Sequence, residues 1–285
     1  MKRKYKIHIA RTAGFCFGVK RAIRLARELA GSGRQIRMLG DLVHNQDVIK
    51  ELEQAGIKKI KRLGNGRGRI LLVRAHGAGI RTIALARRRG YKIIDATCPM
   101  VKAIHKIAGK MSRKGYTIIV LGDKRHEEVQ GIVGQAGKKT YVIDNSGHIP
   151  KAIFEKIIKA AVVVQSTQNA DDILPIVATL RSGIKELKFF NTICKPTTMK
   201  QAEMKTMPLE NDVMIVIGSR ASANTRRLYE ISRKLNPRSH WIESTVELKA
   251  RWFKKAKSIG ITAGASTPET TIQSVINALR RRRCR

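Results

Sequence analysis

The chain has 285 residues, and its 58 Lys and Arg against 21 Asp and Glu give a formal net charge of +37. This balance excludes an acidic, solvating chain and favours an anionic partner, such as nucleic acid, an anionic membrane surface or phosphate. The hydrophobic fraction of 42% provides for a sizeable core, while no apolar run approaches the roughly 20 residues of a membrane span.

Short apolar runs alternate with amphipathic helical patterns along the whole chain. Strands are predicted at residues 6–10, 36–39, 70–74, 92–94, 117–121, 140–143, 161–165, 187–190, 213–217, 239–242 and 258–262. Helices are predicted at residues 18–30, 45–54, 80–89, 99–114, 127–136, 150–160, 170–182, 196–206, 222–235 and 268–280. Continuous apolar strands between helices are typical of parallel sheets covered on both faces, so we expect an α/β fold.

The chain has four cysteines, too few for its length to indicate a secreted disulfide framework. The apolar stretch behind the basic N-terminus is also too short for a signal-peptide core. We therefore expect a cytoplasmic protein.

Cys16, Cys98 and Cys194 share a local setting, because each stands just before a predicted helix. If the three α/β segments are related by pseudo-threefold symmetry, their thiols converge on one centre. Three thiolates suit a soft metal site, and an iron–sulfur cluster held by three cysteines leaves one iron with an open position. The alternative is three separate cysteines that pack as small hydrophobic residues. Cys284, within the C-terminal arginine run, is expected to have no role.

Polar side chains follow many of the predicted strands, where ligands bind in α/β folds. They include His44, His76 and His126, each in a loop that contains glycine, the carboxylate of Glu128, and the hydroxyl and amide groups of Ser166, Thr167, Ser222, Asn224 and Ser266. Ser, Thr and Asn also occur as ordinary helix caps, which is the simpler interpretation of each one alone. Together these groups could hold a diphosphate through neutral donors. No Walker or GxGxxG motif is present, so nucleotide binding is not favoured.

Nine segments, in this order, resemble the IspH (LytB) reductases of the non-mevalonate isoprenoid pathway, and they run from about residue 12 to 270. The segments are GFCFGVKRAI, GDLVHNQDVI, RAHGAG, DATCPMV, HEEVQGIVG, QSTQ, NTICKPTTMKQAE, GSRASANTRRL and TAGASTPE. The resemblance implies conversion of (E)-4-hydroxy-3-methylbut-2-enyl diphosphate to isopentenyl and dimethylallyl diphosphates by two-electron, two-proton reductive dehydroxylation. It also implies a trefoil of three pseudo-symmetric α/β domains with parallel sheets around a central iron–sulfur cluster. We expect these domains at residues 11–97, 98–193 and 194–285, with strand 5–10 joining the third.

The resemblance further implies a role for each candidate residue. Cys16, Cys98 and Cys194 would hold one [4Fe–4S] cluster, whose unique iron binds the hydroxyl oxygen of the substrate. Glu128 would deliver protons, relayed near Ser166 and Thr167. The residues expected to bind the diphosphate or line its pocket are His44, His76, His126, Ser222, Asn224 and Ser266. A ferredoxin or flavodoxin would supply the electrons to a monomeric enzyme that has no membrane partner and no specific nucleic-acid partner.

Three features depart from the family pattern. Ala223 stands where a second serine is common, which removes one side-chain donor to the diphosphate, and Ser166 stands where Thr is usual. The charge of +37 is not required by the mechanism. It motivates an alternative, a nucleic-acid-binding α/β protein, although aromatic residues for base stacking make up only 5% of the chain. A second alternative, a scaffold that has lost turnover, is disfavoured by the retention of Glu128 and the three cysteines.

Overall fold

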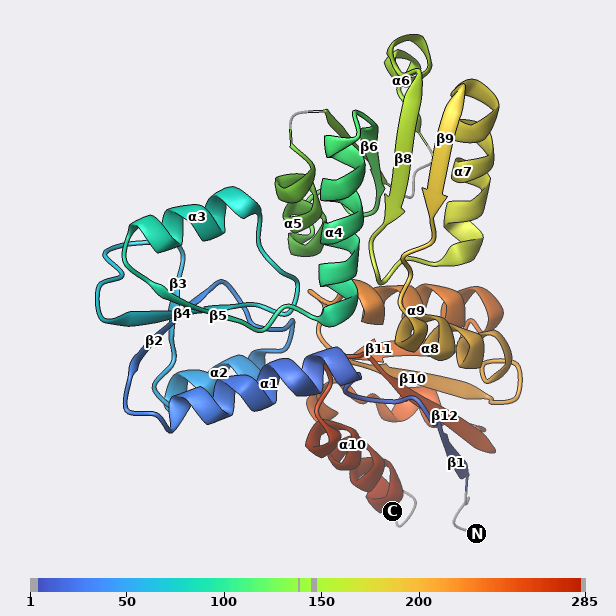
Figure 1. Cartoon of the computed structure of the whole chain (residues 1–285). Coiled ribbons are helices and arrows are strands. Elements are labelled where there is room, and N and C mark those ends of the chain that lie inside the picture. The colour runs from blue at the N-terminus through green and yellow to red at the C-terminus, as the bar shows by residue number, and fades with distance from the viewer. Residues whose placement is uncertain (1–4, 138, 145–147, 283–285) are drawn as a thin grey trace. The chain divides into compact units, whose positions relative to one another are not determined.

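The computed structural model of the chain describes residues 5–137, 139–144 and 148–282 (Figure 1). Within these residues the chain forms three four-stranded sheets, and every paired strand runs parallel to its neighbour. The predicted α/β class is therefore confirmed. Cys284 lies outside the described residues, together with the terminal basic residues Lys2, Arg3, Lys4, Arg283 and Arg285.

The chain divides into two compact units, and each sheet lies within one of them. The first unit comprises residues 5–19, 44–48 and 195–282, and its sheet contains β1 (Lys6–Ile9), β10 (Val213–Ile217), β11 (Ser239–Ile242) and β12 (Ser258–Ala263). Its other elements are α8 (Lys195–Thr206), α9 (Ala223–Leu235), α10 (Glu269–Arg282) and the 3₁₀ turns η1 (Thr245–Glu247) and η2 (Ala250–Phe253).

The second unit comprises residues 20–43 and 49–194 and holds the other two sheets. One contains β2 (Gln35–Leu39), β3 (Lys58–Ile60), β4 (Arg69–Val73) and β5 (Lys92–Asp95). The other contains β6 (Thr117–Leu121), β7 (Thr140–Ile143), β8 (Lys159–Val164) and β9 (Glu186–Phe190). The helices of this part of the chain are α1 (Phe17–Ala30), α2 (Gln46–Gln54), α3 (Ile80–Arg88), α4 (Pro99–Arg113), α5 (Glu127–Ala136), α6 (Lys151–Lys156) and α7 (Ala170–Gly183), of which α1 and α2 begin in the first unit.

All three sheets have the same strand order. The orders are β3-β2-β4-β5, β7-β6-β8-β9 and β11-β10-β12-β1. In the third sheet, the N-terminal strand β1 occupies the edge position that β5 and β9 occupy in the others, and it pairs with β12 from Lys6 opposite Ser258 to Ile9 opposite Ile261. Equivalent sheets place equivalent loops at their carboxyl ends, which is where the candidate residues lie.

The central strands supply the cores. All five residues of β10 are buried, and β6 and β8 are buried except for their first residues. Ile215, Val162 and Ile119 are fully enclosed, as expected for strands covered by helices on both faces. Burial of such side chains contributes roughly 1.5–3 kcal/mol each, so the strand ends are held by rigid, well-packed sheets.

The structure contains one strand that was not predicted, and one predicted helix is shorter than expected. The strand β3 was not predicted, because it has only three residues, two of them Lys58 and Lys59, and lies at a sheet edge where little apolar surface is required. The predicted helix 150–160 ends at Lys156, because Ala160 and Ala161 are fully buried in β8 and pair with β6. Sheet pairing overrides the local helical pattern there.

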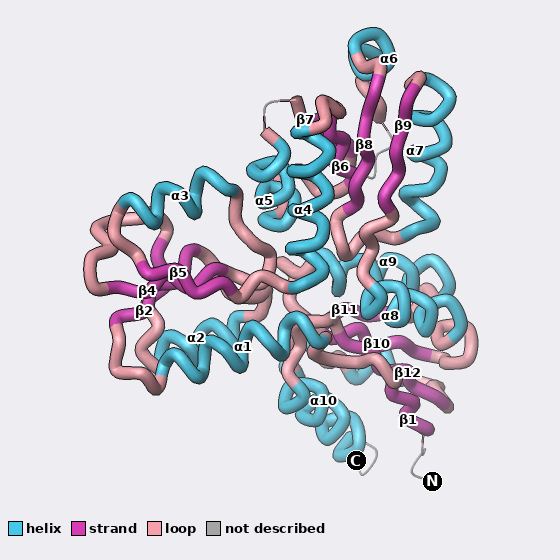
Figure 2. The backbone as a smooth tube through the Cα atoms, viewed as in Figure 1, coloured by secondary structure: helices cyan, strands magenta, loops and turns pink. Residues whose placement is uncertain are grey.

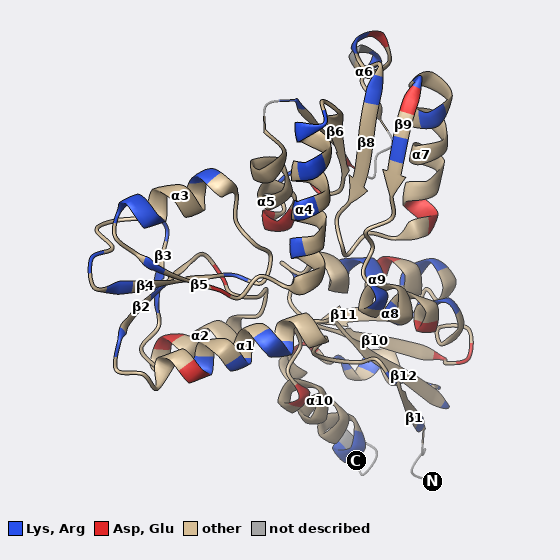
Figure 3. Cartoon of the chain, in the orientation of Figure 1, with Lys and Arg blue, Asp and Glu red and all other residues tan. Residues whose placement is uncertain are grey.

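The excess charge lies at the surface. Among the described residues the buried basic side chains are Lys200 and Arg227, and other Lys and Arg residues lie along the outer faces of helices such as α4 (Figure 3). None of the helices in the described part of the chain combines the length and the hydrophobicity that a membrane span requires.

Candidate functional site

The candidate residues occupy equivalent positions in loops at the carboxyl ends of the inner strands, and these loops are drawn in Figure 2. In one set of loops the candidate residue is the fifth after the strand: His44 after β2, His126 after β6 and Ser222 after β10. In the other set it is the third after the strand: His76 after β4, Thr167 after β8 and Ser266 after β12.

The second set of loops also shares one backbone conformation. A turn closes each loop, in which the fourth residue after the strand donates its N–H to the carbonyl of the first. These hydrogen bonds are Gly77 to Arg74 at 3.0 Å, Gln168 to Gln165 at 3.1 Å and Thr267 to Gly264 at 3.0 Å. A histidine, a threonine and a serine are thus presented by the same turn.

The three cysteines have equivalent backbone contacts. Each stands immediately before a helix, α1, α4 or α8, and each side chain is half-buried. The backbone N–H of each cysteine donates to the carbonyl of the second residue in a neighbouring loop. These hydrogen bonds are Cys98 to Ala75 at 2.9 Å, Cys194 to Ser166 at 3.0 Å and Cys16 to Ala265 at 3.1 Å. A helix N-terminus favours a thiolate, so this donor set fits an iron–sulfur group.

In the second unit, Glu128 is held firmly although it is almost fully enclosed, with 1% of its surface exposed. The backbone N–H of Ser166 donates to its Oε1 at 2.6 Å, and the Ser166 hydroxyl donates to its Oε2 at 2.7 Å. Both carboxylate oxygens therefore have partners, which offsets the cost of burying the group. Because the same Ser166 accepts the Cys194 N–H through its carbonyl, Glu128 is tied to the cysteine loop.

His126 caps helix α5, and the cap determines which ring nitrogen carries a proton. Its Nδ1 accepts the Glu128 backbone N–H at 3.2 Å, so this nitrogen is unprotonated. In the neutral imidazole the proton then lies on Nε2, which becomes the donor. The ring stands edge-on to His76, with 5.4 Å between their centroids. The structure thus brings His76, His126, Glu128 and Ser166 together.

His76 is kept neutral by its surroundings. Burial, followed by the nearby charge of Arg74, lowers the pKa of His76 to about 4. Glu127, the neighbour of Glu128 on α5, also approaches the candidate residues. Its Oε1 lies 2.5 Å from the Arg74 Nη1, and its Oε2 lies 3.4 Å from the His76 Nδ1. Glu127 and Arg74 thus form an ion pair beside the imidazole.

In the first unit, the candidate side chains lie at the start of α9 and in the loop after β12. Ser222 caps α9 by accepting the Thr225 N–H at 3.3 Å, which leaves its own hydroxyl proton for another acceptor. The Ser266 hydroxyl donates to the His44 carbonyl at 3.0 Å. Asn224 is 4% exposed, and neither its Oδ1 nor its Nδ2 has a hydrogen-bond partner within the described residues. An amide buried in this state fits a site that awaits a polar ligand.

Sequence reasoning missed Lys200 and Glu203 of α8. Lys200 is 2% exposed, and its Nζ donates to the backbone carbonyls of Thr12, Gly14 and Ala263. The sequence of this helix did contain an indication that Lys200 is buried. Its apolar residues form no continuous stripe along one face, so polar side chains had to occupy part of the face that packs inward. The buried positions of α8 are Thr197, Lys200, Gln201 and Met204, which follow the helical spacing.

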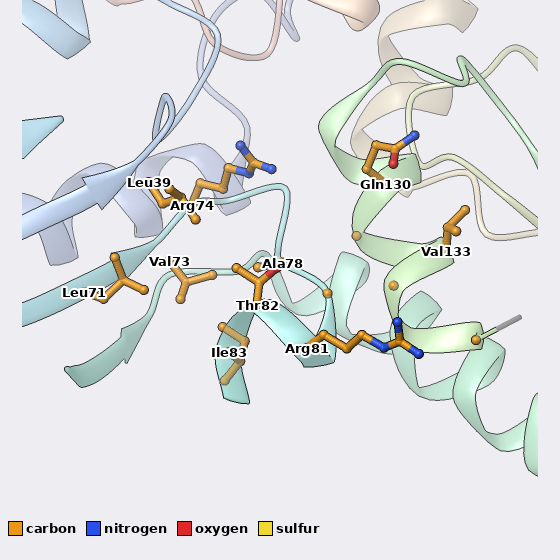
Figure 4. A pocket seen from close by; sticks show the side chains of 14 residues that line it. Leu39, Leu71, Val73, Arg74, Ala78, Arg81, Thr82, Ile83, Gln130 and Val133 are labelled. Carbon is orange, nitrogen blue, oxygen red and sulfur yellow. The ribbon is translucent and has the colours of Figure 1, made fainter. Parts of the chain in front are cut away.

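A separate cavity of about 440 Å³ lies in the second unit between α3, α5 and the ends of β2 and β4 (Figure 4). It contacts the site only through Arg74, since no other candidate group described above lines it. Its walls are mainly apolar, and its lining residues include Leu39, Leu71, Val73, Ile83 and Val133.

The pH dependence of stability provides a test of the packing behind the site. His105 on α4 lies against Gly77 and Gly131, and its burial lowers its pKa to about 4. Between pH 6.5 and 5 the unfolded chain takes up a proton at this position that the folded chain does not, so folding becomes less favourable as pH falls, by up to about 1.4 kcal/mol per pH unit. We expect His105→Gln to lose less unfolding free energy than the wild type over this range in urea titrations. Equal losses in both proteins would contradict the burial of a neutral His105.

Known proteins are similar to this chain in sequence and in fold. A family model described as LytB protein matches residues 7–280. A relative from Pelobacter propionicus, named 4-hydroxy-3-methylbut-2-enyl diphosphate reductase, is 38% identical over 275 residues, which are 96% of this chain and 97% of the relative.

Two solved structures are also similar. One is described as (E)-4-hydroxy-3-methyl-but-2-enyl diphosphate reductase, the terminal enzyme of the non-mevalonate pathway; it matches with a TM-score of 0.71 and 38% identity, over 98% of this chain and 100% of that one. The other, the E-1-hydroxy-2-methyl-but-2-enyl-4-diphosphate reductase from Plasmodium falciparum, matches with a TM-score of 0.88 and 29% identity, over 97% of this chain and 88% of that one.

Proposed function

The chain belongs to the LytB protein family, and from this we propose how its own residues carry out the reaction. The protein is an oxidoreductase of the non-mevalonate isoprenoid pathway. It converts (E)-4-hydroxy-3-methylbut-2-enyl diphosphate to isopentenyl and dimethylallyl diphosphates. The reaction takes up two electrons and two protons, breaks the bond between carbon and the hydroxyl oxygen, and releases that oxygen as water.

The family is one of iron–sulfur enzymes. We propose that Cys16, Cys98 and Cys194 hold one [4Fe–4S] cluster. Each of these thiols stands at a helix N-terminus, and each cysteine N–H is bound by a neighbouring loop, which supports a rigid set of ligands. When bound, the cluster supplies the electrons one at a time and an iron that acts as a Lewis acid toward the hydroxyl oxygen.

We propose that the diphosphate is bound by neutral donors. Burial and Arg74 keep the imidazole of His76 uncharged at neutral pH, and the cap on α5 places the donor proton of a neutral His126 ring on Nε2. In the first unit the Asn224 amide and the Ser222 hydroxyl lie at the start of α9, where helix N–H groups also favour an anion. The proposed diphosphate-binding residues are His44, His76, His126, Ser222, Asn224 and Ser266.

We propose that Glu128 delivers protons to the reacting carbon skeleton and to the departing oxygen. A carboxyl group and a hydroxyl group at hydrogen-bond distance can exchange a proton in either direction, and the Ser166 hydroxyl lies 2.7 Å from Glu128. The Thr167 hydroxyl, which accepts from the Gln165 Nε2 at 3.0 Å, is the next group along the same loop. Ser166 and Thr167 would thus form the relay.

Asn224 provides a test of the diphosphate site that separates binding from folding. The Asn224 amide is buried without a hydrogen-bond partner among the described residues, so its desolvation lowers the folding stability of the substrate-free protein. Replacing it by Ala removes that penalty. We expect Asn224→Ala to raise KM for the substrate about tenfold or more, and to leave the melting temperature of the substrate-free enzyme unchanged or higher. A lower melting temperature with an unchanged KM would contradict a ligand-binding role.

The partners follow from the reaction and the charge. We propose that a ferredoxin or flavodoxin delivers single electrons to a monomeric enzyme, and that the surface charge of +37 attracts this acidic donor. We propose the cytoplasm as the location, because the three thiols must stay reduced to act as ligands. The diphosphate substrate itself accounts for an anionic partner, so no specific nucleic acid is required.

The observation that carries the proposal is the buried carboxyl of Glu128, held by Ser166 at the loop that also binds the backbone of Cys194. The test is anaerobic turnover of the hydroxylated diphosphate with a chemical reductant in deuterated buffer. We expect both isomeric products, each with one solvent deuteron on carbon. Absence of product from protein with a full iron content would contradict the proposal.

A further inference from the structure

Helix α8 holds the segment before Cys16 with two oppositely charged side chains. Glu203 accepts the backbone N–H of Arg11 at 2.8 Å and that of Thr12 at 3.1 Å, and also binds the Thr12 hydroxyl. Lys200, one helical turn away, donates to the carbonyls of Thr12 and Gly14, the latter at 3.0 Å. Together the two side chains bind both kinds of backbone group in residues 11–14.

Lys200 also connects this segment to the sheet. Its Nζ lies 3.2 Å from the carbonyl oxygen of Ala263, the last residue of β12. The loop after β12 in turn accepts the Cys16 N–H through the Ala265 carbonyl. One buried ammonium group therefore fixes the segment before Cys16 to the strand whose loop holds the cysteine itself.

Lys200 remains a cation in this position. Three carbonyl acceptors match the three N–H donors of an ammonium group, which offsets much of the cost of burying it. Carbonyl dipoles do not cancel the charge, and they favour the protonated form. Burial lowers the pKa of Lys200 to about 8, while the nearby Cys16 and Glu203 oppose this shift. A positive charge thus lies in a poorly solvated place close to the thiol.

We propose that Lys200 is a positioning residue that fixes the Cys16 loop and favours the reduced form of the iron–sulfur group. This inference rests on the proposed role of Cys16 as a ligand. Each electron that enters the group adds a negative charge, and a buried cation nearby stabilises that charge more than an exposed one does. Such a residue makes the first electron transfer to the enzyme more favourable without contacting the substrate.

A weaker counterpart exists in the second unit. Arg21 on α1 donates to the carbonyl of Thr97, the residue before Cys98, at 3.3 Å. Arg21 makes this one contact to the loop and is only partly buried, whereas Lys200 makes three and is 2% exposed. We therefore expect the charge at Lys200 to have the larger influence.

The test measures the midpoint potential of the anaerobic holoenzyme by redox titration followed by electron paramagnetic resonance. In Lys200→Met, which keeps the chain length without the charge, we expect the ratio of reduced to oxidised protein at a fixed potential to fall about tenfold, equivalent to about 59 mV for one electron. Lys200→Arg should restore most of this ratio. Lys205→Met removes an exposed lysine of the same helix and should leave the midpoint potential unchanged.

Glu203→Gln separates the effect of the positive charge on the potential from the effect of the hydrogen bonds that hold residues 11–14 in place. It retains Lys200 and removes a negative charge, so the potential should not fall, while release of iron to a chelator should become faster because the N–H groups of Arg11 and Thr12 are held less firmly. Lys200→Met could fail to retain iron. In that case, faster iron release from Glu203→Gln together with iron retention in Lys200→Arg would still support the role of α8 in fixing the segment before Cys16. An unchanged potential in iron-replete Lys200→Met would overturn the inference. Full iron retention in Cys16→Ser, measured alongside, would instead show that the proposed ligand set is wrong.

Discussion

Replacing Glu128 by Gln is expected to reduce turnover by about 10²–10⁴-fold, the usual contribution of a general acid. The variant should fold, because Gln has the same shape and its amide oxygen can still accept the Ser166 N–H. The Ser166 hydroxyl, which now donates to Oε2, can rotate to accept from the new amide group. The ability to carry a proton is lost, while the position of the side chain is retained.

The measurement is anaerobic turnover with a chemical reductant, so that the electron donor does not limit the rate. Iron content, melting temperature and KM should match those of the wild type, which assigns the loss to chemistry. Glu53→Gln, at an exposed position on α2, is the matched control and should retain full activity. A Glu128→Gln rate above one tenth of the wild-type rate would show that another group delivers the protons.

Replacing Cys98 by Ser should abolish turnover through loss of the iron–sulfur group. Cys98 is the N-cap of α4 and precedes Pro99 at the first helical position. Serine is among the preferred N-cap residues, so the helix should form at least as well in the variant. The Cys98 N–H contact to Ala75 does not involve the side chain and should persist. The substitution therefore removes a sulfur donor and little else.

The readouts are iron per protein chain and visible absorption after anaerobic reconstitution, with the far-ultraviolet circular dichroism spectrum as the folding control. We expect the absorption and the turnover to disappear while the spectrum is unchanged. Cys284→Ser makes the same chemical change in the C-terminal arginine run and should leave iron content and activity intact. Normal iron content in Cys98→Ser would remove Cys98 from the proposed ligands.

Much of the fold could be predicted from the sequence because its central strands are continuous apolar runs. The segments VMIVI of β10 and TIIVL of β6 are strands at the predicted residues, and Cys98 and Cys194 were correctly placed between a strand and a helix. The structure gives those placements a physical basis, because the cysteine N–H groups are bound by equivalent neighbouring loops. The chemical roles of the same residues rest on the family resemblance and stay predictions.

The remainder depends on contacts between distant segments. The capping contact of His126 fixes its proton on Nε2, which the residue type does not reveal. Glu127 and Glu128 are adjacent, yet one binds Arg74 and the other binds Ser166, because successive helical residues point in different directions. Lys200 resembled the many other lysines in sequence, and only the packing of α8 against residues 12–14 distinguishes it.

The pairing of β1 with β12 has a consequence for synthesis. Cys16 leaves the ribosome before Cys98 and Cys194, yet the groups that fix its loop are Lys200, Glu203, Ala263 and Ala265, which follow it by more than half the chain. The equivalent contacts of Cys98 and Cys194 are made by Ala75 and Ser166, which are already synthesised when those cysteines emerge. The earliest of the three thiols is thus the last to be fixed, and a nascent chain that ends before Ser258 has no partner for its first strand. Assembly of the proposed centre therefore requires a chain that has been synthesised beyond Ala265.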